Sequence, residues 1–305
     1  MGQSTTEFTA SVRNMVATIR YRGSDDSGVW CDERVGIGLG HARLSILDLS
    51  PEGHQPMVSA SGRYVISYNG EVYNFSELRT ELEHTGAKFR GHSDTEVMLA
   101  HFEKWGIETA VRRFVGMFAF ALWDKHTRTL TLGRDRLGEK PIYYGWQGQT
   151  FLFGSELKAL RAHPAFRADI DRNALALFLR HNYIPAPYSI YQGISKLSPG
   201  CLLTVSLSQR NPQIVPFWSG KQAIEAGLTH PFEGSDSAAV SGLEALLKNA
   251  IGQEMVADVP LGAFLSGGVD SSTVVALMQA QSSRPVKTFT IGFHEEGYDE
   301  AKHAK

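Results

Sequence analysis

Cysteine is scarce in this chain, with only Cys31 and Cys201 among 305 residues. So few thiols argue against a disulfide-stapled scaffold. No apolar run approaches the roughly 20 residues that a membrane-spanning helix requires. The polar N-terminus, from Met1 to Ala10, also lacks the apolar centre of a signal peptide. These absences predict a cytoplasmic protein with no membrane partner.

An excess of one charge is missing as well. The 30 basic and 32 acidic residues are mixed along the chain and give a formal net charge of −2. Because no basic block or arm is present, nucleic acid is not expected as a partner. A hydrophobic content of 42% and a charged content of 20% are typical of globular proteins. The length suffices for two domains, at least one of them with a sizeable core.

Short apolar segments separated by turn residues occupy residues 14–160. They predict strands at Gly36–His41, Tyr64–Tyr68, Glu71–Tyr73, Met117–Asp124, Thr129–Asp135, Tyr143–Trp146 and Thr150–Phe153. The connections are short, and one of them is a predicted Asn69-Gly70 turn, so we expect antiparallel pairing. Helices are predicted over Phe75–Thr85 and over Ser93–Gly106, where Ser93 and Glu96 have the spacing of a capping box. The mixture predicts an α+β domain of antiparallel sheets layered with helices.

The pattern changes after two stretches, 182–187 and 209–217, that each contain two prolines. A helix is predicted over Asp236–Val256, from apolar residues at helical spacing. Beyond it, a buried strand at Leu261–Leu265, a helix at Ser271–Gln279 and a strand at Val286–Phe293 form a βαβ unit, which implies a parallel sheet. We therefore expect domains at 1–210 and 236–305, joined by a linker at 211–235.

The segment Ser266–Ser272, which reads SGGVDSS, joins this strand to this helix. Backbone N–H groups at such a junction and the positive end of the helix dipole favour an anion. Gly267 and Gly268 let the backbone approach a phosphate, and the hydroxyls of Ser266, Ser271 and Ser272 can donate to its oxygens. Asp270 would repel phosphate unless a cation lay between them, so it implies Mg²⁺. The segment is not a Walker A loop, because no Gly-Lys-Ser/Thr follows.

SGGVDSS resembles the pyrophosphate loop of the N-type ATP pyrophosphatases, which have an adenine nucleotide α-hydrolase-like fold. The resemblance implies that the loop binds ATP with Mg²⁺, and that Phe264, Leu265 and Ile291 contact the adenine. Core packing is the alternative role for these three apolar residues, and one residue can serve both purposes.

Motifs through the rest of the chain resemble the class II glutamine amidotransferase domain of glutamine-hydrolysing asparagine synthetases, which is Ntn-hydrolase-like. They are Arg20–Gly28, Gly40–Ile46, Tyr68–Asn74, Ser93–Glu96, Arg134–Pro141 and Phe153–Lys158. Together with SGGVDSS they follow one collinear order from about Arg13 to Lys305. The resemblance makes residues 1–210 the glutaminase domain without its first strand, and residues 236–305 the beginning of the ATP-pyrophosphatase domain.

Hydrolysis of glutamine's side-chain amide passes through a tetrahedral oxyanion, which needs fixed hydrogen-bond donors. The resemblance gives that role to the Asn69 side chain and the Gly70 N–H. It also implies that Arg43 binds the α-carboxylate of glutamine with a two-pronged fork, and that Asp94 and Glu71 bind the α-ammonium. The alternatives are a surface ion pair for Arg43 and helix-terminus electrostatics for Asp94.

The family's nucleophile is an N-terminal cysteine, exposed when the initiator methionine is removed. This chain begins Met1-Gly2-Gln3-Ser4 and does not contain the family's Cys-Gly-Ile-Ala-Gly-like first strand. Neither Cys31 nor Cys201 is placed to replace that residue. The family's synthetase domain also continues well past the equivalent of Lys305. We therefore expect the polypeptide as given to be catalytically impaired in both half-reactions.

The family's reaction supplies the expected ligands, which are glutamine, aspartate, ATP and Mg²⁺. Ammonia released from glutamine would pass to a second site, where ATP activates aspartate and asparagine forms. Two alternatives stay open. One is an amidotransferase that acts on a different carboxylate, and the other is a non-catalytic glutamine- or nucleotide-binding remnant. A homodimer is also left open.

Overall fold

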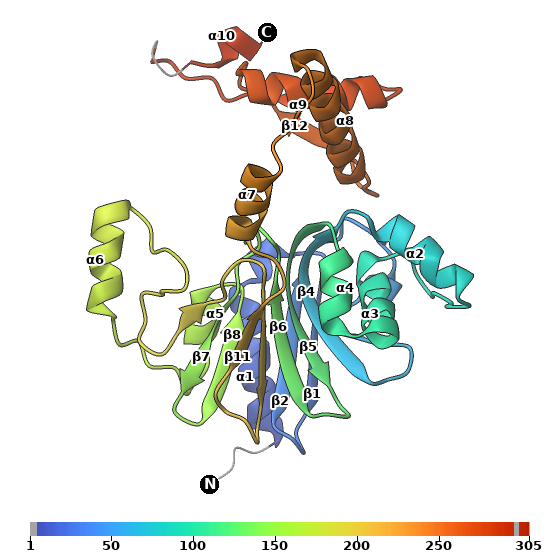
Figure 1. Ribbon diagram of the computed structural model, residues 1–305. Helices are drawn as coiled ribbons and strands as arrows, with labels where there is room; N and C mark the ends of the chain where they lie inside the picture. Colours follow the sequence, from blue (N-terminus) through green and yellow to red (C-terminus); the bar gives the residue numbers. More distant parts are fainter. Residues whose placement is uncertain (1–4, 296–298, 305) are drawn as a thin grey trace. The chain divides into compact units, whose positions relative to one another are not determined.

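The computed structural model describes residues 5–295 and 299–304 (Figure 1). The chain divides into two compact units, Met1–Ile224 and Glu225–Lys305. The division falls within helix α7 (Gly220–Thr229). Residues 211–235, which the sequence assigns to a linker, also contain strand β11 (Gln213–Pro216). This stretch therefore carries regular secondary structure of its own.

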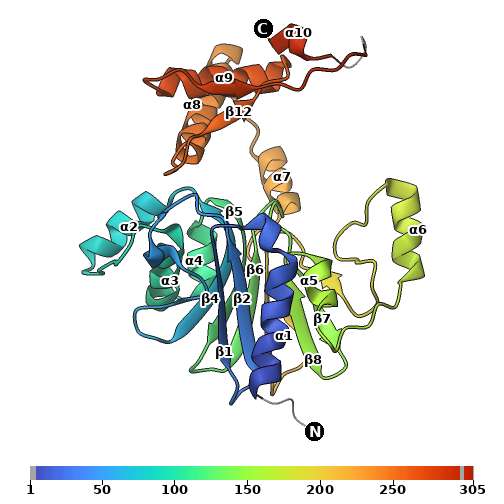
Figure 2. The ribbon, with the colours of Figure 1, turned by 180° about the vertical axis from the view of Figure 1, so that it is seen from behind.

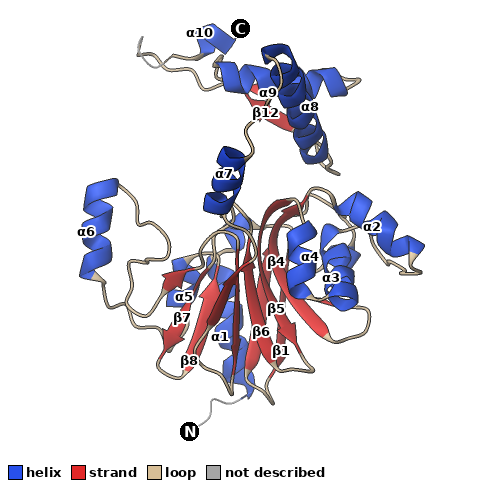
Figure 3. Cartoon of the chain, in the orientation of Figure 1, coloured by secondary structure: helices blue, strands red, loops and turns tan. Residues whose placement is uncertain are grey.

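The first unit contains antiparallel strands and helices (Figure 3). Besides β11, its strands are β1 (Asp26–Asp32), β2 (Ile37–Arg43), β3 (Met57–Val58), β4 (Tyr64–Val72), β5 (Gly116–Asp124), β6 (Thr129–Arg134), β7 (Tyr143–Gln147), β8 (Thr150–Gly154), β9 (Ser195–Lys196) and β10 (Cys201–Ser206). The helices are α1 (Thr5–Thr18), α2 (Phe75–His84), α3 (Asp94–Trp105), α4 (Ile107–Arg113), α5 (Leu157–Arg161) and α6 (Arg172–His181), with 3-10 turns η1 (Arg20–Arg22) and η2 (Pro51–Gly53). The predicted α+β class is confirmed.

The strands form one large sheet and two small ones. The large sheet has six strands in the order β11-β10-β6-β5-β4-β3, and the small sheets are β1-β2 and β8-β7-β9. Every pairing within these three sheets is antiparallel. Short connections join β1 to β2, β5 to β6 and β7 to β8, whereas β4 and β5 pair across the three helices α2, α3 and α4. β2 and β8 are both edge strands of their small sheets.

Strand β5 shows how both faces of the large sheet become buried. Its side chains alternate, so Phe118 and Phe120 pack in one core cluster while Ala119 and Trp123 pack in the other. Helices α2, α3 and α4 cover the first face (Figure 1). Side chains of β2, β7 and β8 contribute to the second cluster, on the opposite face. The core of the first unit is therefore a pair of apolar layers on either side of one sheet.

Helix α1, which the sequence did not predict, packs on the small sheet β1-β2 (Figure 2). The close approach depends on glycine in β2. A Cβ at Gly38 would lie 2.7 Å from a methyl carbon of Val12, and a Cβ at Gly40 would lie 2.4 Å from one of Val16. A larger residue at either position would push the helix away from the strand.

The second helix prediction is confirmed at both ends. The Ser93 hydroxyl accepts a hydrogen bond from the Glu96 N–H at the start of α3, and Gly106 follows the helix with a φ of 78°. The Glu96 carboxylate accepts the N–H groups of Arg90 and Gly91. The predicted Asn69-Gly70 turn is wrong, because β4 runs unbroken from Tyr64 to Val72. Long pairing with β5 overrides the local turn preference.

The second unit contains α8 (Asp236–Glu254), β12 (Gly262–Phe264), α9 (Val269–Gln281), β13 (Lys287–Phe289) and α10 (Ala301–Ala304). β12 and β13 pair in parallel across α9, which confirms the βαβ prediction. The expected burial of the first strand is wrong, since Leu261 and Phe264 are 42% and 79% exposed. A two-stranded sheet leaves much of each strand in contact with water. Within the described residues, no helix is both long and apolar enough to cross a membrane.

Candidate functional site

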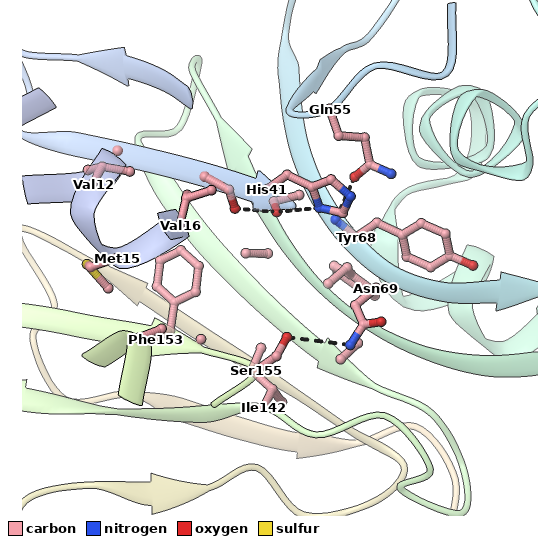
Figure 4. A pocket seen from close by; sticks show the side chains of 18 of the residues that line it. Val12, Met15, Val16, His41, Gln55, Tyr68, Asn69, Ile142, Phe153 and Ser155 are labelled. Carbon is pink, nitrogen blue, oxygen red and sulfur yellow. Dashed lines mark hydrogen bonds between the residues drawn. The ribbon is translucent and has the colours of Figure 1, made fainter. Parts of the chain in front are cut away.

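A cavity of about 680 Å³ opens in the first unit and contains all five residues that the sequence assigned to glutamine. These are Arg43, Asn69, Gly70, Glu71 and Asp94. Residues of β2, β4, β8 and α1 line it, so the two edge strands β2 and β8 face a common space (Figure 4). Polar residues of β2, β4 and α3 line part of it, and apolar side chains of α1 and β8 line another part. Segments far apart in the sequence thus meet at one site.

Gly70 presents its N–H on the open side of β4. Across the ladder lies Phe118, whose N–H and C=O both bond to Asp135, at 3.1 and 2.8 Å. The Gly70–Phe118 pair therefore exchanges no ladder hydrogen bonds, and the Gly70 N–H points away from β5. Gly70 has a φ of +150°, and a Cβ there would lie 2.0 Å from the Met117 carbonyl oxygen. Only glycine fits this position without displacing β5.

Asn69 precedes Gly70 in β4, and it lines the cavity. Its Nδ2 lies 3.5 Å from the Ser155 hydroxyl, at the end of β8 (Figure 4). The amide N–H₂ has a second hydrogen to donate. Asn69 and Gly70 thus offer a side-chain donor and a backbone donor to the same space, which is the arrangement that an oxyanion requires.

Asp94 supplies the buried anion of the site. It is only 5% exposed at the first turn of α3, and its Oδ2 accepts the Tyr68 hydroxyl at 2.7 Å and the Val72 N–H at 2.9 Å. Burial raises the pKa of this carboxyl, and the hydrogen bonds from Val72 and Tyr68 oppose that rise. A ligand ammonium beside it would stabilise the ionised form. Glu71 is half-buried in β4 and also lines the cavity.

Arg43 is 7% exposed, so the surface ion pair that was its alternative role is wrong. Its Nη1 donates to the Ser50 carbonyl at 3.2 Å, and its Nη2 donates to the carbonyls of Leu47 and Asp48. These bonds hold the guanidinium in the loop after β2. A guanidinium has five N–H donors, so these three bonds leave others for a carboxylate. Its role in binding the α-carboxylate stays a prediction.

Sequence reasoning missed other polar residues of the cavity, among them His41, Gln55, Tyr68 and Ser155. Burial and the neighbouring Arg43 lower the pKa of His41 from 6.5 to about 4, so this imidazole is neutral at pH 7. Its Nδ1 lies 3.5 Å from the Ser67 hydroxyl. His41, Tyr68 and Ser155 stand inside motifs already singled out, but nothing in a single sequence distinguishes them from core residues.

Neither cysteine lies among the described residues that line the cavity. Cys31 is half-buried in β1 and Cys201 is buried in β10. Burial raises the pKa of both thiols, so each is predominantly protonated at neutral pH. Both thiols thus belong to strands of the fold and lie outside the lining of the cavity.

In the second unit, residues 265–268 lead directly into α9, as the phosphate-loop interpretation requires. The hydroxyls of Ser266 and Ser271 lie 2.9 Å apart, and the Gly268 N–H donates to the Ser266 hydroxyl at 3.3 Å. Gly268 caps the helix without a side-chain hydrogen bond, so the first N–H groups of α9 are not capped by it. Gly267 has a φ of +80°, and a Cβ there would meet the backbone of His303 in α10 at 2.6 Å.

The remaining residues assigned to the nucleotide lie around this loop. Asp270 and Ser272 are exposed in the first turn of α9, and Leu265 is half-buried. Phe264 and Ile291 are 79% and 65% exposed, so core packing does not explain their apolar side chains. No group of three or more metal-ligand side chains occurs in the described part of the chain. Mg²⁺ that is bound to phosphates needs only one or two carboxylates from the protein. Asp270, together with the serine hydroxyls of the loop, fits such an ion.

Family comparisons match the chain in two parts. The model of the glutamine amidotransferase domain matches residues 1–218, and that of asparagine synthase matches residues 242–305. A putative glutamine-hydrolysing asparagine synthetase of Methanocaldococcus jannaschii is 37% identical over 96% of this chain and 58% of its own length. Asparagine synthetase 3 of Bacillus subtilis is 37% identical over 92% of this chain and 45% of its own. The chain thus spans about half the length of these relatives.

Solved structures agree with the fold. The allosteric regulatory enzyme of purine biosynthesis superposes with a TM-score of 0.52 at 16% identity, over 94% of this chain and 63% of that one. At this identity the likeness concerns the fold alone. It agrees with the predicted Ntn-hydrolase-like arrangement of antiparallel sheets and helices.

Proposed function

Since the chain belongs to the glutamine amidotransferase family, with an asparagine synthase segment after it, we propose that it binds glutamine in the cavity beside β4 and ATP at residues 266–272. In the whole protein, ammonia released from glutamine would be joined to the β-carboxylate of aspartate after ATP has activated it. The reaction would take place in the cytoplasm. Aspartate as acceptor rests on the names of the relatives.

One observation carries the glutamine assignment. Arg43 of β2, the β4 residues Asn69, Gly70 and Glu71, and Asp94 of α3 come from three elements, yet all of them line one cavity. Free glutamine carries an α-carboxylate, an α-ammonium and an amide carbonyl. The cavity has a cation, two acids and two amide donors that match these groups.

The donors at Asn69 and Gly70 act on the amide carbonyl. As the carbonyl carbon becomes tetrahedral, negative charge collects on its oxygen, and fixed N–H donors stabilise that charge. Strand β4 holds both donors at adjacent positions, so little rearrangement is needed. Arg43 and Asp94 anchor the other end of glutamine, and the amide carbonyl is thereby brought to the donors.

The ATP assignment rests on the strand–loop–helix geometry of residues 262–281. Backbone N–H groups at the start of α9 and the hydroxyls of Ser266 and Ser271 would hold the phosphate oxygens. Phe264 and Ile291 supply exposed apolar surface for a base. Bound Mg²⁺ would neutralise phosphate charge between the oxygens and Asp270.

Ligand binding by the purified full chain tests the glutamine assignment directly. Isothermal titration should show saturable binding of L-glutamine, weaker binding of D-glutamine, and at least tenfold weaker L-glutamine binding by Asp94→Asn. The variant removes the anion while it keeps the side-chain size. As a matched control, Asp169→Asn changes an exposed acid outside the cavity and should leave the affinity unchanged. Equal binding of both enantiomers by the parent chain would contradict the assignment.

The nucleotide site has its own test. ATP with Mg²⁺ should bind at least tenfold more tightly than ATP with a chelator, and Asp270→Asn should remove most of that difference. Asp236→Asn serves as the control, since Asp236 occupies the corresponding exposed first turn of α8. If the chelator has no effect on the parent chain, Asp270 does not act through a metal ion.

A further inference from the structure

Gln55 is a buried amide whose two ends are both used. It is 6% exposed, its Oε1 accepts the Tyr68 N–H at 2.8 Å, and its Nε2 donates to the Thr95 hydroxyl at 3.3 Å. The side chain thus joins the segment before β3 to strand β4 and to the start of α3. It lines the cavity, and Figure 4 shows it above Tyr68 and beside His41. Leaving either end unpaired in this environment would be costly.

The register of the sheet explains why a side chain takes this place. Met57 lies opposite Ile66 and Val58 opposite Val65, so the same register would place Gln55 opposite Tyr68. The Gln55 carbonyl is turned toward β1 instead, where it lies 2.1 Å from the position of a Cβ on Gly28. The side-chain oxygen of Gln55 therefore accepts the Tyr68 N–H. The Gln55 backbone carbonyl would accept this N–H if the ladder between β3 and β4 continued to Gln55.

Three N–H groups point outward along this edge of β4, at positions 68, 70 and 72, because alternate residues face the same side. Gln55 accepts the first at 2.8 Å, and Asp94 accepts the third at 2.9 Å. The middle one belongs to Gly70. The two acceptors fix the strand on both sides of the Gly70 N–H and leave that donor directed into the cavity.

We propose that Gln55 is a positioning residue for glutamine. It fixes both the direction of the Gly70 N–H and the position of the Asp94 carboxylate. The second link runs through Thr95, whose hydroxyl lies 3.4 Å from Asp94 Oδ1, and through Tyr68, whose hydroxyl bonds Asp94 Oδ2. One buried amide thus connects the donor for the amide carbonyl with the acid for the ammonium. The inference rests on the proposed function, since glutamine is the ligand it serves.

Two variants separate the two hydrogen bonds of Gln55. Gln55→Met keeps the length of the side chain and removes both bonds. Thr95→Val keeps the bond from Tyr68 to Gln55 and removes the bond from Nε2, together with the contact of the Thr95 hydroxyl with Asp94 Oδ1. We expect Gln55→Met to weaken L-glutamine binding in isothermal titration by at least tenfold, and Thr95→Val by threefold or less. Urea unfolding of both variants establishes that each is folded under the conditions of the titration.

Amide hydrogen exchange of the ligand-free full chain, followed by NMR, gives a readout that a loss of stability alone would not move. In the parent chain, Tyr68 and Val72 should be protected and Gly70 should exchange at least tenfold faster than both. In Gln55→Met, the protection of the Tyr68 amide should fall and the chemical shift of the Gly70 amide should change. The distant strand β10 should keep its protection.

The outcomes distinguish the inference from the proposed function. If the parent chain binds L-glutamine and Gln55→Met binds it equally well, or if Gly70 is as protected as its two neighbours, the positioning role is overturned and the proposed function stands. If the parent chain does not bind L-glutamine at all, the proposed function fails and this inference fails with it.

Discussion

The two units offer ligands two different kinds of surface. In the first, the candidate side chains Arg43, Gln55 and Asp94 are all less than 10% exposed and hydrogen-bonded to their own chain. In the second, Asp270 is exposed and the donors are mostly backbone N–H groups at a helix start. Recognition of glutamine would depend on preorganised side chains, and recognition of phosphate would depend on the end of a helix.

The sheets account for this contrast. A six-stranded sheet covered on both faces can bury polar side chains at its edge and satisfy them there. The parallel pair β12-β13 has too little area to enclose a side chain on either face. Since unsatisfied buried groups are costly, buried polar side chains need an enclosing sheet, and among the described residues the first unit provides one.

The largest expected effect comes from one substitution made in each unit. Phe120→Ala removes a ring that is 1% exposed in β5, and Phe264→Ala removes one that is 79% exposed in β12. We expect Phe120→Ala to lower the free energy of unfolding by about 3–5 kcal/mol and Phe264→Ala to change it by less than about 0.5 kcal/mol. Urea denaturation measures both, and similar losses would break the comparison.

Asp135 tests how much a buried network contributes. Its carboxylate is fully buried and accepts the N–H groups of Phe118, Leu137, Gly138, Glu139 and Lys140. Asp135→Asn would turn an N–H₂ group toward these donors, so we expect a loss of about 3 kcal/mol in the free energy of unfolding.

Exposed Asp169 offers the matched control for this substitution. Asp169→Asn should change the free energy of unfolding by less than about 0.5 kcal/mol. If Asp135→Asn also changed the free energy of unfolding by less than about 0.5 kcal/mol, the stability of the 135–140 turn would not depend on the Asp135 carboxylate.

His41 predicts a pH dependence confined to the first unit. Its pKa falls from 6.5 to about 4 on folding, so between these values the unfolded chain binds more protons than the folded one. The contribution of neutral His41 to the free energy of unfolding is therefore complete above pH 6.5. As the pH falls toward 4, this contribution is lost, by up to about 3 kcal/mol.

The difference between the parent chain and His41→Asn isolates this effect. The raised pKa of Asp94 acts in the opposite direction, and it is present in both proteins. Thermal melts from pH 4 to 7.5 should show the two curves converging as the pH falls. Parallel curves would mean that the pKa of His41 does not change on folding.

The smallest expected effect compares the same motif in the two units. Ser93 accepts the Glu96 N–H at the start of α3, and Ser235 accepts the Ala238 N–H at the start of α8. Substitution by alanine should cost about 1 kcal/mol for each cap. We expect the greater loss at Ser93, which is 3% exposed, because the uncapped N–H groups there have less access to water. Equal losses in urea denaturation would show that burial does not strengthen the cap.

Local patterns predicted much of the fold. The apolar segment Met117–Asp124 before a polar turn identified β5, the Ser93–Glu96 spacing identified the start of α3, and the change after Asp236 identified the parallel βαβ unit. Helix α1 was missed because Thr5–Thr18 combines weak amphipathicity with several polar residues, and it is held by contact with glycines of β2. Such packing leaves no local signal.

The sequence by itself determined which chemical groups are available, namely Asn69 beside Gly70, an arginine at 43, an acid at 94 and the hydroxyl- and glycine-rich segment 266–272. Only the tertiary structure decided that Asn69-Gly70 continues a strand, that Gln55 and Asp94 accept the N–H groups on either side of Gly70, and that Phe264 is exposed. Residue types and short-range spacing are written along the chain. Strand register and burial depend on partners many residues away, and those partners set which way each donor points.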